Sequence, residues 1–352
     1  MSGGCFEVIA PGLTTSVQDR GRYGYQEQGM PVAGAMDGIA LRLANALAGN
    51  AEGTAALEIG YLGPTLSVAA ESVRVAFCGS AKLVLQPAGG GEPRGLKPWR
   101  SITLKRGDRL QVGSIEEGSI GYLAIAGGLA IAPFLDSLST YTRAGLGGFE
   151  GRALKAGDRL PLALSQAPNG DELELADDAK AVYGSGPVRV VLGPQEDRFT
   201  ARGIETFLAG SYMVTKEADR MGLRLDGPVI EHTNGADIAS EGLVTGSIQV
   251  PGNGKPIILM ADRQTTGGYT KIATVISADL PRVGQLRPGD AITFQAVGVA
   301  EAEAVRRAQE KAIAALIAGI RPAQPEFALD HSALYTENLI SGMVDAKTGA
   351  WR

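Results

Sequence analysis

Short apolar runs broken by glycine, proline and serine recur along most of the chain. Residues 6–9 end before Pro11 and Gly12, and the runs 57–68 and 73–77 lie between similar breaks. Runs of this length, bounded by turn-forming residues, are typical of β-strands. The pattern therefore predicts a mainly β protein built from short strands.

Two segments show helical spacing instead. After Asp37, which is a good N-cap, apolar residues recur at helical spacing as far as Leu47, and Gly49 provides a stop. From residue 299 to residue 320, charged residues fall on one face and Ala, Ile and Leu on the other. This second pattern predicts an amphipathic helix.

The stretch from 257 to 285 combines two strand-like runs with a dense group of polar side chains. Residues 257–260 and 272–276 are apolar, and between them lies a polar segment that ends in Gly267 and Gly268. Two apolar runs around a Gly-Gly break predict two core strands joined by a tight loop.

That loop offers a carboxylate, a guanidinium, an amide and two hydroxyls, on Asp262, Arg263, Gln264, Thr265 and Thr266. Glycine lets the backbone approach a ligand closely and turn its N–H groups toward an anion or a carbonyl oxygen. A hairpin tip whose Asp and Thr side chains cap their own backbone has the same composition. The residue types alone favour neither interpretation.

The segment from 12 to 37 is the second place where polar groups gather beside glycine. It is too long and irregular for a hairpin connection, and its scattered apolar residues argue against disorder. We interpret it as an ordered functional loop whose polar groups are Gln18, Asp19, Arg20 and Arg22.

Three copies of the pattern L-[KR]-x-G-D-x-[IL] occur, within residues 104–112, 154–162 and 286–294. In each copy Gly-Asp is typical of a turn, and the residues that follow alternate as in a strand. The unequal spacing of the copies argues against a solenoid. We expect the three aspartates to shape turns and we exclude them from the candidate site.

Composition excludes several classes of protein. The net charge of −5 and the pI near 5.3 argue against a nucleic-acid-binding or polybasic membrane surface. No apolar run is long enough to span a bilayer, and the N-terminus lacks the basic and apolar regions of a secretory signal. Cys5 and Cys78 provide neither a disulfide framework nor a metal site. There are two histidines, of which we expect His232 to be a structural or partner-facing residue and not a general base. We therefore expect a cytoplasmic protein with no metal site of its own.

An acidic segment at 165–187, poor in large apolar residues, marks a boundary. We expect an N-terminal β-rich subdomain over 1–186, a C-terminal β-barrel over 187–297, and an amphipathic helix with a packed tail over 298–352. The tail is too apolar for a solvated segment. We expect it to dock on the barrel or on a neighbouring chain.

Several long motifs, in order from about residue 6 to residue 294, make the chain resemble one family. They are PGLTTSVQDRGRYGYQEQGMPVAGAMD, STYTRAGLGGFEGR, GPQEDRF, DRMGLRLDGP, SEGLVTGSIQVP and ADRQTTGGYTKIATVISADL. Together they resemble the allophanate hydrolase subunit 2 family, whose members are also described as KipA-like proteins, as the C subunit of 5-oxoprolinase, and as biotin-dependent carboxyltransferase family proteins. The departures are Ala33, Asn253, Lys255 and Thr270, and none of them removes an obvious catalytic group.

The resemblance implies a mainly β fold of cyclophilin-like, closed β-barrel subdomains. It also implies the C subunit of a bacterial ATP-dependent 5-oxoprolinase, which opens 5-oxoproline to glutamate. Its partners would be a KipI-like protein (the B component) and a LamB/YcsF-like protein (the A component). We expect this chain to be inactive by itself, with ATP and Mg²⁺ used in the complex, because it has no GxxxxGK[ST] loop.

A related domain of urea carboxylase transfers a carboxyl group from carboxybiotin to urea, which gives an alternative function. This chain has no biotin-acceptor Met-Lys-Met, so any biotin would come from a partner. A non-catalytic, KipA-like regulatory binding subunit is a further alternative. Prolyl-isomerase activity would rest on fold alone, which does not fix function.

Amide activation and carboxyl transfer both need donors aimed at an oxygen and charged groups that position the reactants. Our catalytic candidates are Asp19, Arg20, Asp262, Gln264, Thr265 and Thr266, and our substrate-binding candidates are Arg22, Arg220, Gln249, Gly267, Gly268 and Tyr269. We expect the segments 18–22 and 262–269 to converge on one cleft. There Asp262 would hold Arg20 or Arg220, while the threonine hydroxyls and the Gly267 N–H face the substrate oxygen. For Arg143 and Arg152 we favour structural ion pairing.

Overall fold

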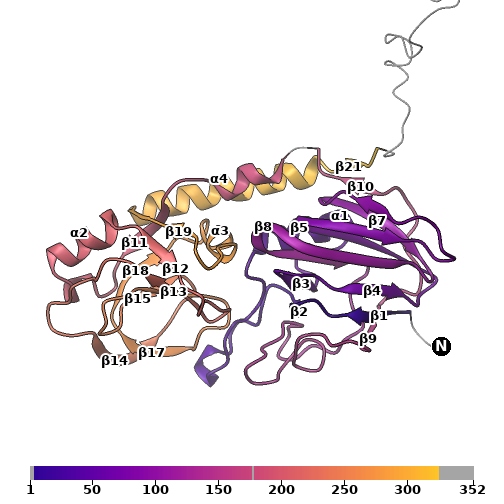
Figure 1. Cartoon of the computed structure of the whole chain (residues 1–352). Helices are drawn as coiled ribbons and strands as arrows, with labels where there is room; N and C mark the ends of the chain where they lie inside the picture. Colours follow the sequence, from indigo (N-terminus) through magenta and orange to yellow (C-terminus); the bar gives the residue numbers. More distant parts are fainter. Residues whose placement is uncertain (1–3, 177, 325–352) are drawn as a thin grey trace, which may run out of the picture.

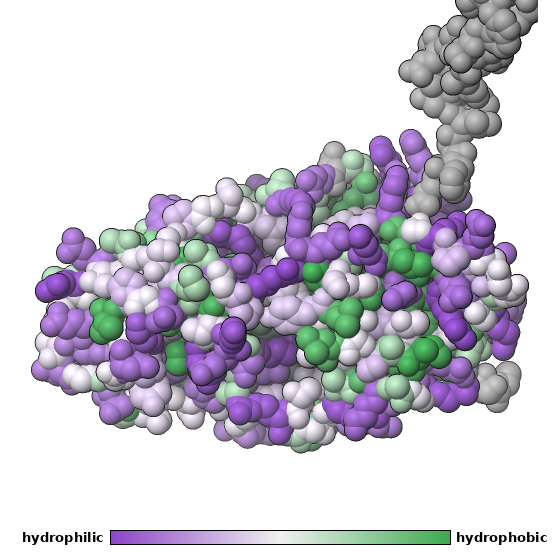
Figure 2. All heavy atoms as spheres, viewed as in Figure 1, coloured by the Kyte–Doolittle hydropathy of each residue, from purple (hydrophilic) through white to green (hydrophobic). Residues whose placement is uncertain are grey.

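The computed structural model describes residues 4–176 and 178–324 of the chain. Two large sheets lie side by side, and the long helix α4 (Val299–Ala318) runs along both of them (Figure 1). Polar and charged residues cover most of the face seen in Figure 2, and its apolar side chains form small separate groups. The mainly β fold predicted from the short apolar runs is confirmed.

The first sheet contains eleven strands around an apolar interior. They are β1 (Cys5–Ala10), β2 (Thr14–Gln18), β3 (Ala56–Gly60), β4 (Thr65–Val68), β5 (Ser72–Gln86), β6 (Arg94–Leu96), β7 (Arg100–Lys105), β8 (Arg109–Ile125), β9 (Arg159–Pro161), β10 (Leu173–Glu174) and β21 (Arg321–Pro322). The long strand β8 pairs with β3, β4 and β5, so that the sheet curls around its core. That core consists of residues such as Phe6, Leu57, Phe77 and Leu123.

The second sheet contains eight strands and is nearly closed. Its order is β19 (Ala291–Ile292), β12 (Tyr212–Val214), β13 (Gly222–Asp226), β16 (Ile257–Leu259), β15 (Ser247–Gln249), β18 (Lys271–Val275), β11 (Val188–Leu192) and β20 (Phe294–Ala296). The two edge strands, β19 and β20, are separated in sequence by Thr293 alone. The sheet therefore curves back on itself into a barrel.

The stretch 257–285 does not form the predicted hairpin. Its two apolar runs are strands β16 and β18, as expected, but β15 lies between them and pairs with both. The glycines expected to turn the chain, Gly267 and Gly268, lie inside another strand, β17 (Thr266–Tyr269), which pairs with β14 (Asp237–Gly242) in a separate two-stranded ribbon. The prediction was wrong because a strand from upstream in the sequence enters between the two runs, which local periodicity does not reveal.

The helix predicted after Asp37 is confirmed as α1 (Gly38–Ala48). The Asp37 carboxylate accepts hydrogen bonds from the N–H groups of Ile39 and Ala40, and Gly49 closes the helix in the left-handed conformation. Most of α1 is buried, because it packs on β5 and β8, and its apolar residues belong to a hydrophobic cluster that also contains residues of the second sheet. Helix α1 therefore contributes to the junction of the two sheets.

The helix predicted over 299–320 is confirmed as α4, which buries Ile313 and Gln309 and leaves most of its other residues at least partly exposed. Two shorter α-helices are α2 (Ala201–Ala209) and α3 (Leu280–Gly284), and the 3₁₀ helices are η1 (Gln26–Gln28), η2 (Ala179–Tyr183) and η3 (Glu196–Arg198). Helix α4 contacts α1, β11 and η2. The boundaries proposed at residues 186 and 297 stay predictions, and the tail beyond residue 324 lies outside the described residues.

The segment 12–37 is a loop only in part. Residues Thr14–Gln18 form β2, which pairs with β3 over its whole length, so the expectation of one continuous loop was wrong. The remaining residues bridge the two sheets, because the Ala33 N–H donates to the Ala261 carbonyl at 3.1 Å. The segment from 19 to 37 therefore lies at the junction.

The three repeated Gly-Asp turns form as predicted. In each, the aspartate carboxylate accepts the backbone N–H three residues earlier, at 2.8 Å for Asp108, 2.7 Å for Asp158 and 2.7 Å for Asp290. The centroid of the His232 ring lies 4.7 Å from that of the Phe199 ring, and the expectation that His232 is structural or partner-facing stays a prediction. Cys5 and Cys78 are free and buried. In the described part of the chain no helix has the length and apolar character needed to cross a membrane.

Candidate active site between the two sheets

A cavity of about 340 Å³ lies between the two sheets. The first sheet contributes Ser16 from β2 and Glu58 from β3, and the second contributes Leu223 of β13. Loop residues complete the lining, among them Arg220 before β13 and Asp262 after β16. Loops at the junction of two rigid sheets are favourable places for function.

Arg220 and Asp262 form a buried, bidentate ion pair at this cleft. Arg220 Nε lies 2.9 Å from Asp262 Oδ2 and Arg220 Nη2 lies 2.9 Å from Oδ1. The backbone reinforces the pair, because the Asp262 N–H donates to the Arg220 carbonyl at 2.8 Å. Asp262 is 2% exposed. Of the two arginines that we expected Asp262 to hold, it holds Arg220.

A second carboxylate, on Glu58, contacts the same guanidinium from the first sheet. Arg220 Nη1 donates to Glu58 Oε1, and Arg220 Nη2 donates to the Gly34 carbonyl at 2.6 Å. The other oxygen, Glu58 Oε2, accepts the Tyr122 hydroxyl at 2.5 Å and the Met36 N–H at 2.9 Å. One guanidinium therefore joins both sheets and the bridging segment 32–37.

The electrostatics of this triad follow from its burial. Burial alone would lower the pKa of Arg220, but Glu58 and Asp262 outweigh it and raise the pKa. Burial raises the pKa of Asp262, and the Arg220 guanidinium opposes that rise. Burial, together with the charge of Glu58, raises the pKa of the Tyr122 hydroxyl well above its ordinary value. The tyrosine therefore stays a hydrogen-bond donor across the neutral range.

Arg143 gives the cleft a cation that is not enclosed by carboxylates. It is exposed, lines the cavity together with Thr142, and contacts the sulfur of Met221. Our expectation of a structural ion pair holds for Arg152, which Asp158 binds at 2.7 Å and 2.9 Å, but Arg143 makes its contact with Met221 instead. An accessible guanidinium at such a cleft suits the carboxylate of a small substrate.

The segment 18–22 is fixed by the loop around Ser139. The Asp19 carboxylate accepts from the hydroxyls of Ser137 and Ser139 and from the Leu138 N–H, and Gln18 donates to the Thr140 carbonyl at 3.1 Å. In this structure these hydrogen bonds hold the side chains of Asp19 and Gln18 against residues 137–140. Their role in chemistry stays a prediction.

Arg22 is 1% exposed, and its Nη2 donates to the Ser139 carbonyl. Burial lowers the pKa of Arg22, and the charges of Asp19 and Asp262 act in the opposite direction. None of residues 18–22 is among the described lining residues of the cleft, so the expected convergence of segments 18–22 and 262–269 on one cleft stays a prediction. Arg20 points elsewhere, into a larger cavity whose lining includes Glu52.

The predicted site residues from Thr265 to Tyr269 lie along the β14–β17 ribbon. Gly267 pairs with Glu241 and Thr266 with Gly242, and Thr265 accepts the Leu243 N–H through its carbonyl. Gly268 and Tyr269 continue the same strand. Among the described residues that line the cleft, Asp262 is the one that comes from segment 262–269. Whether the ribbon reaches a substrate stays a prediction.

Gln249 lies beside this ribbon. It is 2% exposed on β15, and a Cβ at Gly267 would lie 2.8 Å from its Nε2. Glycine at position 267 therefore allows this close approach, and the side chain of Gln264 also lies nearby. The roles of Gln249 and Gln264 in the reaction stay predictions.

The sequence analysis did not name Glu58 or Tyr122 as candidates, and it favoured structural ion pairing for Arg143. Glu58 had a usable signal, because it is a single charge inside the apolar run AALEIG at 55–60, and charges in buried strands are paired or functional. Tyr122 and Arg143 had none, since an apolar strand and a glycine-rich loop both contain such residues without a site.

The family model for the carboxyltransferase domain, subdomain A and B, matches residues 28–296. The chain belongs to this family. It is 36% identical over 308 residues to the C subunit of 5-oxoprolinase from Escherichia coli, a match that covers 87% of this chain and 95% of that protein. The resemblance stated from the sequence motifs is confirmed.

Urea-processing enzymes are also similar to this chain. The urea amidolyase of Saccharomyces cerevisiae is 32% identical over 328 residues, which is 88% of this chain but 18% of that enzyme. The solved structure of the Kluyveromyces lactis urea carboxylase matches with a TM-score of 0.79 and 32% identity, covering 93% of this chain and 31% of that one. The fold is therefore shared with a part of larger urea enzymes.

Proposed function

We propose that this chain is the C subunit of a bacterial ATP-dependent 5-oxoprolinase, acting with a KipI-like partner and a LamB/YcsF-like partner. The observation that carries the proposal is the near end-to-end match to a separate 5-oxoprolinase subunit, 95% of whose length is covered. The urea amidolyase of S. cerevisiae is matched over only 18% of its length. The match therefore extends over nearly the whole of the 5-oxoprolinase subunit, and over a small part of the urea enzyme.

The groups of the cleft suit a small amide that carries a carboxylate. Arg143 is the accessible cation for that carboxylate, and Glu58 and Asp262 are acceptors toward which an amide N–H can turn. The Arg220 guanidinium holds both acceptors in place, Glu58 on the first sheet and Asp262 in the loop after β16 of the second. Positioned groups of this kind act by orienting the substrate and by stabilising charge as it develops.

ATP and Mg²⁺ belong, in this proposal, to the assembled complex. Across the described residues, no group of three or more His, Cys, Asp or Glu side chains is placed to hold a metal ion. Mg²⁺ that arrives with a nucleotide needs only one or two carboxylates besides the phosphates. We therefore expect the nucleotide site to be completed by a partner protein.

The test is to assay this chain, assembled with its KipI-like and LamB/YcsF-like partners, for ATP-dependent glutamate formation from 5-oxoproline. Arg143→Gln should raise the KM for 5-oxoproline about tenfold or more, because a charged hydrogen bond to the substrate carboxylate is lost. Arg152→Gln is the matched control, since Arg152 pairs with Asp158 away from the described cleft lining. No glutamate formation by the complete complex would overturn the proposal.

The alternative function is carboxyl transfer from carboxybiotin to urea or a similar amide, supported by the likeness to urea carboxylase. Urea has no carboxylate, so Arg143→Gln should leave the KM for urea unchanged. Urea-dependent ATP hydrolysis in the presence of a biotin-carrying partner, without activity on 5-oxoproline, would favour this alternative. A chain that binds the KipI-like partner while the complex turns over neither substrate would favour a KipA-like regulatory role.

A further inference from the structure

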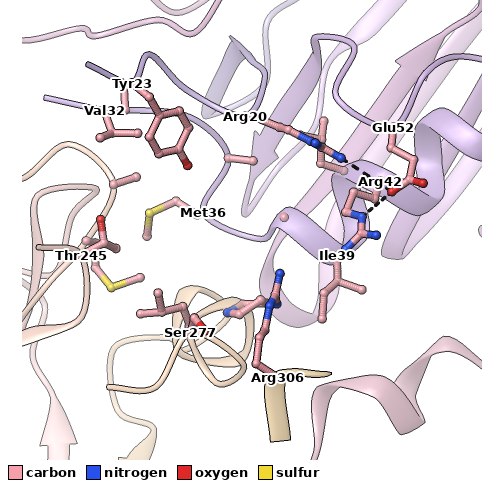
Figure 3. Close-up of a pocket in the computed structure, with 18 of the residues that line it drawn as sticks. Arg20, Tyr23, Val32, Met36, Ile39, Arg42, Glu52, Thr245, Ser277 and Arg306 are labelled. Carbon is pink, nitrogen blue, oxygen red and sulfur yellow. Dashed lines mark hydrogen bonds and ion pairs between the residues drawn. The ribbon is translucent and has the colours of Figure 1, made fainter. Parts of the chain in front are cut away.

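A second and larger cavity, of about 670 Å³, shares Met36 with the cleft. Its walls come from the segment 20–36, from α1, from the residues just after β16, and from α3 and α4 (Figure 3). A volume of this size holds an organic ligand of several hundred daltons. The proposed reaction gives this cavity no role.

Three arginines from three different segments line the cavity: Arg20 from the bridging segment, Arg42 from α1 and Arg306 from α4. Two glutamates accompany them, Glu52, which is labelled in Figure 3, and Glu310. Three guanidinium groups against two carboxylates leave one net positive charge in the lining. This excess stands out on a chain whose net charge is −5.

Arg42 contacts both glutamates, and Glu310 is shared between Arg42 and Arg306. Arg42 Nε lies 2.6 Å from Glu52, and Arg42 Nη1 lies 2.9 Å from Glu310. Arg20 is 3.7 Å from Glu52, beyond hydrogen-bond distance, and its side chain is 58% exposed. Arg306 pairs with Glu310 on its own helix and also donates to Gln309 at 2.9 Å. Arg20 is therefore the guanidinium with most capacity left for a ligand.

The rest of the lining is mostly apolar. Val32, Met36 and Ile39 come from the segment leading into α1 and from α1 itself, and Leu280 and Pro281 come from α3. Tyr23 stands at the opening with its ring toward the cavity, and this residue is 68% exposed (Figure 3). Apolar walls with a few charged groups are typical of sites for small organic molecules.

We propose that this cavity binds an organic anion with an apolar body, held through its carboxylate or phosphate by Arg20 and Arg306. The apolar body lies along Met36, Ile39 and Leu280, and the Tyr23 ring covers the opening. Arg42 holds Glu52 more closely than Arg20 does, so Glu52 competes little with the ligand for Arg20, whereas Arg306 shares its guanidinium between Glu310 and the ligand. This inference is independent of the reaction proposed for the cleft.

Three eight-carbon probes test the proposal by isothermal titration calorimetry on the full chain. Octanoate carries a carboxylate, octyl phosphate carries a phosphate, and 1-octanol has the same chain without charge. At least one of the two anions should bind with one site per chain, at least tenfold more tightly than 1-octanol, because charge-assisted hydrogen bonds are the strong ones. The anion that binds more tightly identifies the headgroup chemistry.

The variants are Arg20→Gln and Arg306→Gln, with Arg307→Gln as the matched control. Arg307 is the next residue on α4, but its side chain is 65% exposed and pairs with Glu303. Each of the first two variants should weaken binding of the preferred anion about tenfold, and Arg307→Gln should not change it. Far-UV circular dichroism and the melting temperature verify that each variant is folded; if one of the two does not fold, the other decides.

Three results would overturn the proposal. The first is that neither anion binds, and the second is that 1-octanol binds as tightly as the anions. The third is that Arg20→Gln and Arg306→Gln bind the preferred anion like the unaltered chain.

Discussion

Arg220 links the two sheets at their junction. Its guanidinium contacts Glu58 on β3 of the first sheet, Asp262 in the loop after β16 of the second sheet, and the Gly34 carbonyl in the bridging segment. Both carboxylates are almost completely buried, at 5% exposure for Glu58 and 2% for Asp262. Removing one member leaves charge in the interior without its partner, which costs far more than breaking an exposed pair.

Asp262→Asn should therefore lower the free energy of unfolding by about 3–5 kcal/mol. The measurement is denaturation by urea of the isolated chain, with Glu303→Gln as the control. Glu303 pairs with Arg307 on the surface of α4, where an ion pair contributes at most about 1 kcal/mol. If Asp262→Asn costs no more than Glu303→Gln, the triad is not a major link between the sheets.

A substitution at Thr266 tests the part of the predicted site that lies along the β14–β17 ribbon. The residue is exposed at the start of β17. If its hydroxyl donates to the substrate oxygen, Thr266→Val should lower the kcat of the assembled complex by about 10²–10³-fold. Little change in melting temperature is expected, because an exposed hydroxyl contributes little to stability. An unchanged kcat would remove Thr266 from the site.

Individual elements show what local sequence is able to specify. The Gly-Asp turns, the helix capped by Asp37 and the helix over 299–318 depend on contacts a few residues apart, and all of them form as predicted. The hairpin expected around Gly267 fails, because β15 enters between β16 and β18. Strand order depends on which distant segments meet, and the hydrophobic pattern of one stretch does not encode that.

One of the Gly-Asp turns gives a prediction about pH. The Arg152 guanidinium, hydrogen-bonded to Asp158, holds the pKa of that carboxyl below its ordinary value of 3.8. A group with a lowered folded-state pKa contributes stability above its unfolded pKa and loses it as the pH falls through the folded value. The difference in unfolding free energy between the unaltered chain and Asp158→Asn should therefore be constant from about pH 5 to 7 and shrink below about pH 4.

Urea denaturation of both proteins at several pH values measures this difference. A difference that stays constant down to pH 3, or that grows on acidification, would show that Asp158 is not stabilised as a carboxylate by Arg152. The aspartate of another copy, Asp290, is not paired with Arg152. Asp290→Asn is therefore the matched control for loss of the turn alone.

On the scale of the whole molecule, the family and the mainly β fold could be recognised from long motifs and short apolar runs. The cleft was predicted in part. Asp262 and Arg220 were chosen from glycine-rich polar segments, and they do meet at the junction. Glu58 and Tyr122 lie on apolar strands of the first sheet, and their approach to Arg220 requires the two sheets to be docked first. No local pattern contains that docking.

The proposed function implies that this chain does not turn over 5-oxoproline by itself. The reason is chemical, since the sequence has no phosphate-binding GxxxxGK[ST] loop for a nucleotide. Purified chain should release glutamate at a rate indistinguishable from a protein-free control, and activity should appear only on addition of the KipI-like and LamB/YcsF-like partners. Robust ATP-driven ring opening by the chain alone would contradict the assignment of the nucleotide to the complex.

If this chain depends on a partner, it needs a surface that binds the partner. We expect this surface beside the cleft. Tyr61 lines the cleft, and its neighbours Leu62 and Leu13 are joined by a backbone hydrogen bond of 2.9 Å and are 47% and 65% exposed. Large exposed apolar residues that lie together are typical of an interaction site. A partner docked there would cover the opening and exclude water from the reacting amide.

The double variant Leu13→Ser and Leu62→Ser should weaken association with the KipI-like partner about tenfold or more, measured by surface plasmon resonance, because two buried leucines would be lost from the interface. Met213→Ser is the control, since Met213 is equally apolar and 54% exposed but lies on β12 of the other sheet. The melting temperature should change little in both, because all three residues face solvent. Equal affinity of both variants for the KipI-like partner would show that the partner does not bind beside the cleft. It would also contradict the idea that the partner closes the site.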